Sequence, residues 1–237
     1  MCYYFPCYIS SVRTQSLYRG MLKNYKGLGI NTRPGGRMKW IGLTGGIASG
    51  KSSVSALLRE KGYPVLDADH VAHQALDLNT PTYQQILQHF GPSILTASGQ
   101  IDRSLLGGLV FENVDALKYL ESIIHPFVQS VVKAERKNLQ DQGHAFAIYD
   151  VPLLYEKQME DQFDHVVVVY CAPEQQIERL MERNALTREE AQLRLGCQKS
   201  IEEKKGLATT VINNTGSYQE LSSQVDRWIN EFTKSLK

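Results

Sequence analysis

Short apolar runs alternate with amphipathic segments along the chain from Trp40 onward. Two of these runs show no polar alternation, which is typical of parallel strands buried on both faces. The expected strands are Trp40–Thr44, Pro64–Asp67, Ala145–Tyr149, His165–Tyr170 and Val211–Ile212. Helical spacing, glycine stops and capping boxes predict helices over 51–61, 82–90, 104–110, 115–139 and 218–234, with a break in the fourth at Pro126. Two more helices are expected to begin after Thr187 and after Ser200. Strands that alternate with helices predict an α/β fold with a parallel sheet covered on both faces.

Charge is distributed unevenly along the sequence. The chain has 237 residues with 26 basic and 25 acidic side chains, and six of the basic residues but no acidic ones fall within 1–37. The remainder holds 20 basic against 25 acidic groups, a net charge of −5. Because the residues after 37 are net acidic, they lack the positive charge that binds a polyanion, so nucleic acid is not an expected partner. The longest apolar run, Val166–Ala172, is far shorter than the ~20 residues of a membrane helix, so no membrane partner is expected either.

Residues 1–37 show no hydrophobic periodicity and end in the turn-forming Pro34-Gly35-Gly36. We expect them to be a leader outside the fold, either disordered or upstream of a natural start at Met38. A transit peptide or a membrane-touching arm is the alternative interpretation. The four cysteines form no CxxC pair and lack zinc-ligand spacing, which favours a reducing compartment and predicts a cytoplasmic protein.

A glycine-rich segment directly follows the first predicted strand and begins the first predicted helix. It satisfies G-x-x-x-x-G-K-[ST] with Gly45, Gly46, Ile47, Ala48, Ser49, Gly50, Lys51 and Ser52. Residues without Cβ let consecutive N–H groups turn inward around a phosphate, and the helix dipole favours the negative charge. Lys51 offers a charge to the β- and γ-phosphates, and the Ser52 hydroxyl is a ligand for Mg²⁺. The pattern indicates nucleoside triphosphate binding, against the alternative of a glycine-rich surface turn.

Two carboxylates lie at the end of the second predicted strand, Asp67 as its last residue and Asp69 two residues further on. In an open parallel sheet, ligands bind beyond the carboxyl ends of the strands. Strand alternation would send both side chains to the same side, where one could hold Mg²⁺ through water and the other accept a proton from an acceptor hydroxyl. We favour this chemistry over the alternative, in which either residue only caps a helix that begins near His70.

Two further sites have weaker support. Arg179 and Arg183 lie four residues apart on one predicted helix face, which suits a closing segment that stabilises phosphoryl transfer. Spacing alone favours a solvated face paired with neighbouring glutamates. His125-Pro126 interrupts a predicted helix, either as a kink or as a substrate contact.

The motifs together resemble the dephospho-coenzyme A kinase family over about 38–232. The motifs that carry the resemblance are Ile41–Ser52, Asp67-Ala68-Asp69, Ile101-Asp102-Arg103 with Leu106 and Val110-Phe111, His125-Pro126, Val151–Leu154 with Glu156, Gln176–Arg183, Gln198, Lys204 and Val211–Asn214. The phosphate loop is common to many kinases, whereas this set in this order is far more specific.

The resemblance implies a three-layer P-loop NTPase fold with a helical substrate-binding insertion and a lid. The expected core covers 38–78, 142–178 and 206–237, the insertion about 79–141 and the lid about 179–205. It implies transfer of the γ-phosphate of ATP to the ribose 3′-hydroxyl of dephospho-coenzyme A, with Mg²⁺, by a monomer or weak oligomer. Asp69 would be the general base, and Lys51 and Arg179 would also be catalytic. The substrate would be contacted by Asp67, Asp69, Arg103 and His125. The metal would be held by Ser52 and Asp67. The residues implied to bind ATP are Gly45, Gly46, Ile47, Ala48, Ser49, Gly50, Lys51, Ser52, Ser53, Arg179, Asn213 and Asn214, the last two near the adenine.

The chain departs from the family pattern at three positions. Ala48 stands where glycine is frequent, and Asn184 and Thr209 stand where acidic residues are frequent, which affects the expected lid details. The alternatives to this function are a kinase of another small hydroxyl substrate, such as a nucleoside or shikimate, and a P-loop protein that uses nucleotide binding as a switch. The absence of an Asn-Lys-x-Asp motif argues against a GTPase switch.

Overall fold

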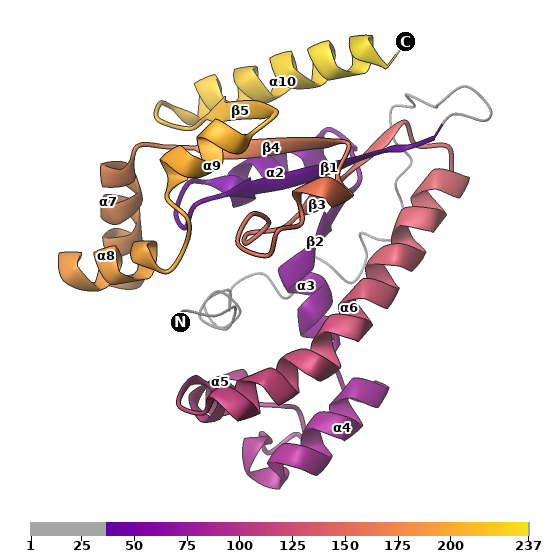
Figure 1. Cartoon of the computed structure of the whole chain (residues 1–237), viewed down its shortest axis with the longest axis vertical. Coiled ribbons are helices and arrows are strands. Elements are labelled where there is room, and N and C mark those ends of the chain that lie inside the picture. Colours follow the sequence, from indigo (N-terminus) through magenta and orange to yellow (C-terminus); the bar gives the residue numbers. More distant parts are fainter. Residues whose placement is uncertain (1–36, 237) are drawn as a thin grey trace. The chain divides into compact units, whose positions relative to one another are not determined.

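The structure is a computed structural model that describes residues 37–236, which fall into two compact units. The core unit holds the described residues up to Leu66 and those from Leu139 onward (Figure 1). The helical unit is Asp67–Asn138, so it begins earlier than the insertion expected from residue 79. Apart from Arg37, the expected leader lies outside the described residues.

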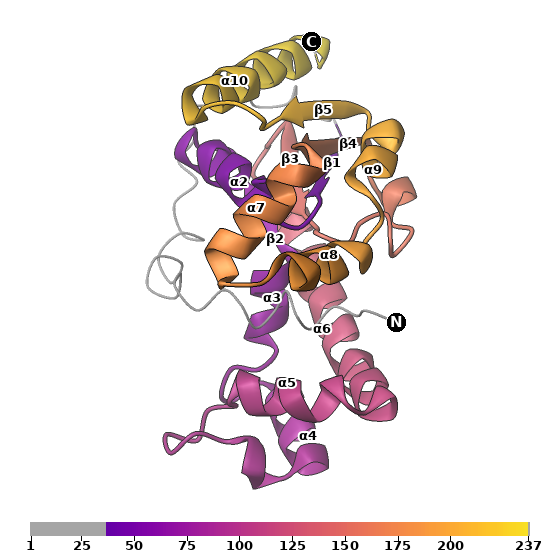
Figure 2. The ribbon, with the colours of Figure 1, turned by 90° about the vertical axis from the view of Figure 1, so that its left-hand side faces the viewer.

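Five strands form one parallel sheet in the order β2-β3-β1-β4-β5 (Figure 2). Their bounds are β1 Lys39–Gly45, β2 Val65–Asp67, β3 Phe146–Asp150, β4 His165–Tyr170 and β5 Thr210–Asn213. The central strand β1 pairs with β3 along one edge and with β4 along the other. The two faces of the sheet are covered by other segments, and every residue of β3 is buried, which explains the apolar runs without alternation. Because the strands are parallel, the ends of β1, β3 and β4 meet at one edge of the sheet.

Helices connect the strands and begin close to where the sequence predicts them. They are α2 Lys51–Glu60, α3 Ala68–Gln74, α4 Pro81–Phe90, α5 Arg103–Phe111, α6 Val114–Asp141, α7 Pro173–Asn184, α8 Arg188–Gly196, α9 Ile201–Leu207 and α10 Tyr218–Ser235, with short 3₁₀ turns at Pro92–Ile94 and Glu160–Gln162. The predicted capping boxes at Thr187, Ser200 and Ser217 are confirmed and open α8, α9 and α10. No described helix has a stretch that is both long and apolar enough to span a bilayer.

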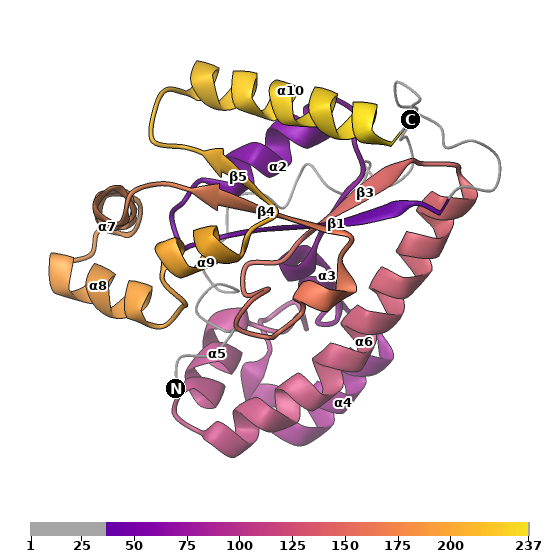
Figure 3. The same cartoon turned by 45° about the horizontal axis from the view of Figure 1, so that its top comes forward.

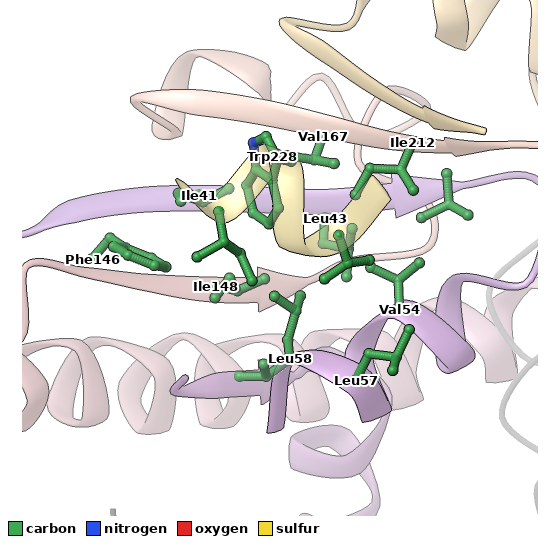
Figure 4. Close-up of a cluster of buried hydrophobic side chains, with 14 of the residues drawn as sticks. Ile41, Leu43, Val54, Leu57, Leu58, Phe146, Ile148, Val167, Ile212 and Trp228 are labelled. Carbon is green, nitrogen blue, oxygen red and sulfur yellow. The ribbon is translucent and has the colours of Figure 1, made fainter. Parts of the chain in front are cut away.

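The main hydrophobic core lies between the sheet and the adjacent helices α2 and α10 (Figures 3 and 4). Val54, Leu57 and Leu58 supply the apolar stripe of α2, and Trp228 comes from α10. The opposite face of the sheet is covered by the segment that follows β3. There a Cβ on Gly42 would meet Leu154 at 2.6 Å, so the chain packs directly onto the bare backbone of β1.

The helical unit has its own apolar cluster, built from α3 to α6. Its most buried members are Ala72, Ala75, Ile86, Ile94, Leu106, Val110 and Leu120. The predicted entry to α4 is confirmed: the Thr80 hydroxyl caps the helix by accepting from Tyr83 N, and Pro81 occupies the first turn. A separate cluster gives this unit a core of its own.

The predicted break at Pro126 is wrong, because α6 runs without interruption from Val114 to Asp141. A proline inside a helix removes one backbone hydrogen bond and costs about 3 kcal/mol. Here Leu120 and Ile124 before the proline and Phe127 and Val128 after it all pack on the same apolar cluster. Burial of one continuous stripe on both sides therefore outweighs the local cost.

Candidate phosphate-binding site

The predicted phosphate loop lies where the sequence places it, between β1 and α2. Ala48 and Gly50 have φ of 59° and 91°, both in the left-handed region, and Ser49 N donates to Gly46 O at 3.1 Å. No side chain of the described chain caps α2, whose N-cap is Gly50. The first N–H groups of a helix lack partners within it, so this start is suited to an anion. The arrangement can bind a phosphate group.

Two glutamines bind the backbone of Ile47, one at its carbonyl and one at its N–H. Gln176 of α7 donates through Nε2 to Ile47 O at 2.6 Å, and Gln198 accepts through Oε1 from Ile47 N at 3.0 Å. Gln176 is almost fully buried, so this amide is fixed in orientation by its surroundings. The glutamines come from distant parts of the sequence and set the shape of the loop from outside.

Asn214 joins three elements at the same edge of the sheet. Its Nδ2 donates to Ser49 O at 2.8 Å, its backbone N donates to Tyr170 O at 2.6 Å, and its carbonyl accepts from Arg179 Nη2 at 2.9 Å. Asn214 is buried, whereas Asn213 is exposed and bonds to Gln224 at the start of the turn into α10. The structure thus gives Asn214 a role in holding the loop; the expected adenine contact of both residues stays a prediction.

Gly50→Ala should weaken ATP binding, because an alanine at φ 91° is strained and its Cβ would collide with the Asn214 amide. The left-handed conformation costs a non-glycine residue about 1–2 kcal/mol, which corresponds to about a tenfold loss of affinity. Titration calorimetry with ATP measures the effect. Gly206→Ala in α9, where an added Cβ meets nothing within 4 Å, is the matched control and should bind ATP as the wild type does. Unchanged affinity in Gly50→Ala would contradict the proposed loop geometry.

Lys51 forms an ion pair with Asp150, the last residue of β3. Asp150 is 1% exposed, and its second carboxylate oxygen accepts from Ser55 Oγ at 2.5 Å. A buried carboxylate is stable only when paired and hydrogen-bonded, and both conditions are met here. Sequence reasoning missed Asp150, although it lies at the end of a predicted buried strand just as Asp67 does. The place of Asp150 directly after a predicted strand is the sequence signal that could have identified it as a site residue.

The two predicted carboxylates behave differently from each other. β2 ends at Asp67, and Asp67 Oδ1 accepts from Asp69 N at 3.0 Å and from His70 N at 3.1 Å, so it caps α3. Strand alternation, from which both side chains were expected on one side, does not extend to Asp69, because Asp69 already belongs to α3. Asp67 therefore caps a helix, as the alternative interpretation expected, and its chemical role stays a prediction. Both capping bonds go to the same oxygen of Asp67, Oδ1. Capping is therefore compatible with the proposed metal-binding role of Asp67 and the proposed catalytic role of Asp69.

Arg179 lies beside the buried thiol of Cys171 as well as Asn214. Burial raises the pKa of Cys171, and the neighbouring Arg179 guanidinium opposes this rise. Arg183 is exposed and donates to Asn184 Oδ1 at 2.9 Å. The two arginines predicted to act together therefore have separate partners, and only Arg179 lies at the loop.

An apolar cluster connects the expected lid to the phosphate loop. Helices α7 and α8 lie side by side (Figure 2) and enclose Ile177, Leu180 and Ala191. Ile47 and Ala48 of the loop pack against this cluster. Ala48 thus gives a physical account of one departure from the family pattern: its methyl group contacts apolar side chains while its backbone adopts the left-handed conformation that favours glycine.

Four predicted site residues, Asp67, Asp69, Arg103 and His125, belong to the helical unit. Arg103 begins α5 after its cap Asp102; burial lowers its pKa, and the Asp77 carboxylate opposes this. His125 lies within α6, with its side chain 47% exposed and its Nε2 4.0 Å from Glu121 Oε1. Their expected contacts with the substrate stay predictions.

The oxygen donors at the loop fit a magnesium–nucleotide complex. Ser52 is exposed in the first turn of α2, and Ser53 N donates to Gly50 O at 3.0 Å. Within residues 37–236, no group of three or more His, Cys, Asp or Glu side chains is placed to hold a metal by itself. Mg²⁺ bound with a nucleotide needs no such group, since water and phosphate oxygens complete its coordination.

Comparison with known proteins agrees with the geometry. The family model described as dephospho-CoA kinase matches residues 39–220. The dephospho-CoA kinase of Bdellovibrio bacteriovorus is 44% identical over 197 residues, which cover 82% of this chain and 98% of that protein. A dephospho-CoA kinase domain-containing protein of Danio rerio is 43% identical over 79% of this chain and 82% of its own length.

Two solved structures are similar along nearly their whole length. TT1252 from Thermus thermophilus aligns with a TM-score of 0.69 and 36% identity, covering 83% of this chain and 98% of that one. Dephospho-CoA kinase from Campylobacter jejuni aligns with a TM-score of 0.66 and 32% identity, covering 84% of this chain and 98% of that one. The expected P-loop kinase fold and the resemblance are confirmed. The chain belongs to the dephospho-CoA kinase family.

Proposed function

We propose that this protein transfers the γ-phosphate of ATP to the ribose 3′-hydroxyl of dephospho-coenzyme A, giving coenzyme A and ADP. The observation that carries the proposal is the loop between β1 and α2, shaped by Gln176, Gln198 and Asn214 around a helix start that has a glycine N-cap and no side-chain cap. Family membership supports the choice of acceptor. ATP is the co-substrate, and dephospho-coenzyme A is the acceptor.

The loop and Lys51 bind the phosphates of ATP. In the described state Lys51 is paired with Asp150, which keeps its ammonium at the sheet edge beside the loop. When ATP binds, this charge is directed to the β- and γ-phosphates. Ser52 and Asp67 would hold Mg²⁺, which when bound neutralises charge on the phosphate oxygens.

Asp69 acts as the general base. The acceptor oxygen forms a bond to the γ-phosphorus, its proton passes to the Asp69 carboxylate, and the bond between the γ-phosphorus and the bridging oxygen breaks to release ADP. Arg179 stabilises the charge that develops on the transferred group. Arg103 and His125 orient the acceptor from the helical unit.

The remaining properties follow from composition and family. We propose a cytoplasmic monomer or weak oligomer that requires Mg²⁺ and has neither nucleic acid nor a membrane as a partner. The acidic balance of the chain beyond residue 37 supports the absence of polyanion binding.

An acceptor panel tests the proposed function. The purified full-length chain is given ATP, Mg²⁺ and one acceptor at a time: dephospho-coenzyme A, coenzyme A, adenosine, shikimate, gluconate or water alone. ADP release should depend on dephospho-coenzyme A, and ³¹P NMR of the product should show a new 3′-phosphomonoester. Equal or absent ADP release with every acceptor would contradict the proposal, and a preference for another acceptor would favour the alternative kinase.

A further inference from the structure

A buried lysine lies directly behind the phosphate loop. Lys204 of α9 is fully buried, and its Nζ donates to Gly45 O at 3.1 Å, to Pro152 O at 3.3 Å and to Glu156 Oε1 at 2.8 Å. Gly45 is the first residue of the loop. An ammonium group has three donors, so this one is fully used by a single carboxylate and two backbone carbonyls.

The same carboxylate holds the chain segment that returns from α8. This return segment, residues 197–200, connects α8 to α9. Glu156 Oε1 accepts from Lys199 N at 2.9 Å as well as from Lys204, and Gln198 of the segment accepts from Ile47 N. The loop is therefore bound at Gly45 O by Lys204 and at Ile47 N by Gln198, and both residues belong to the last part of the lid expected over about 179–205.

The Lys204–Glu156 ion pair is explained better by a role in positioning the phosphate loop than by a contribution to the stability of the fold. A buried ion pair often adds little to stability compared with apolar groups of the same size, because both charges lose their water. Glu156 Oε2 is buried and has no hydrogen-bond partner among the described residues, which makes the pair more costly still. What the lysine supplies, and an apolar side chain could not, is a fixed bond to the Gly45 carbonyl.

We propose that Lys204 and Glu156 are positioning residues that couple the conformation of the phosphate loop to the return segment of the lid, and so set the affinity for ATP. The inference deepens the proposed function and rests on it. Movement of α8 would be transmitted to Gly45 and Ile47 through Lys204 and Gln198, and loop ordering by ATP would in turn favour one position of the segment.

The test compares Lys204→Met, Glu156→Gln and the double variant with the wild type in the full-length chain. Hydrogen exchange of the amides in peptides that cover residues 45–53 is measured without nucleotide, and ATP affinity is measured by calorimetry. In Lys204→Met the loop amides should exchange about tenfold faster, and the affinity for ATP should fall by about tenfold. Each factor corresponds to a loss of about 1.4 kcal/mol of loop ordering. Glu156→Gln, which leaves both carbonyl bonds of Lys204 possible, should have a smaller effect. In turnover assays the KM for ATP should rise while the KM for dephospho-coenzyme A stays unchanged.

Asp164→Asn is the matched control. The side chain of Asp164 is 14% exposed and is also paired with a lysine, but it binds Lys39 Nζ, Arg37 and Trp40 N at the opposite end of β1. This variant should lower the melting temperature and leave loop exchange and ATP affinity within about twofold of the wild type.

The proposal is overturned if the Lys204 and double variants fold and keep wild-type loop exchange and ATP affinity. It is also overturned if Asp164→Asn changes both as much, since the effect would then be general destabilisation. Should Lys204→Met alone not fold, the double variant, which leaves no unpaired charge buried at this place, decides the question in the same way. Exchange and ATP binding need no acceptor, so a wild type that binds ATP but fails to phosphorylate dephospho-coenzyme A would contradict the proposed function and leave the coupling intact.

Discussion

Lys51→Ala is expected to lower kcat by about three orders of magnitude or more, because it removes the cation that stabilises charge on the transferred phosphate. The structure adds a second expected effect. Asp150 is 1% exposed and loses its ion-pair partner in this variant, keeping the hydrogen bond from Ser55. Breaking a buried pair by removing one partner costs about 3–5 kcal/mol, so the melting temperature should fall as well. ADP release and thermal unfolding measure the two effects separately.

The double variant Lys51→Ala/Asp150→Asn separates chemistry from stability. A neutral amide at position 150 is cheaper to bury than an unpaired carboxylate and still accepts from Ser55, so part of the lost stability should return. The activity should not return with it. Recovery of kcat along with stability in the double variant would show that Lys51 acts through the fold and not on the phosphates.

Asp69→Asn is expected to lower kcat by about 10²–10⁴, the usual contribution of a general base, with the KM for ATP nearly unchanged. The substitution preserves the size of the side chain and its place in the first turn of α3. Steady-state kinetics with varied ATP, at saturating dephospho-coenzyme A, measures both parameters. Near-normal turnover would remove Asp69 from the base role.

Asp67→Asn is the control for this experiment. Asparagine caps a helix about as well as aspartate, so α3 should keep the hydrogen bonds to the N–H groups of Asp69 and His70. If Asp67 helps to hold Mg²⁺ as proposed, the variant should need more Mg²⁺ for half-maximal rate while its maximal rate falls less than that of Asp69→Asn. Equal losses in both variants, independent of Mg²⁺, would leave the two carboxylates without distinct roles.

Features encoded within a few residues were predicted well from the sequence. The phosphate loop falls at a strand–helix junction because its glycines lie directly between an apolar run and a periodic segment. The caps at Thr187, Ser200 and Ser217 were equally local, since each hydroxyl and its glutamate lie three residues apart. In these cases the sequence pattern and the hydrogen bonds involve the same residues.

Features that depend on distant contacts were missed or wrong. Pro126 breaks a helix by local rules, and only the packing of its flanks on the cluster of the helical unit explains why α6 continues. Asp150 required knowing that β3 lies beside β1, which brings it to Lys51. Gln198 and Lys204 were noted as part of a family pattern, but their bonds to Ile47 and Gly45 join residues that are far apart in the chain.

The topology also has a consequence for how the chain folds during synthesis. β1 pairs with β3 in a register that matches Lys39 with Phe146, so the helical unit is translated between two strands that are neighbours in the sheet. At about 5–20 residues per second, a ribosome takes roughly 5–20 s to supply the partner strand after β1 has been made. The helical unit depends on shorter-range contacts and can close its own cluster in that interval. The nascent central strand therefore spends seconds with both its edges unpaired, a period in which a chaperone would protect it from aggregation.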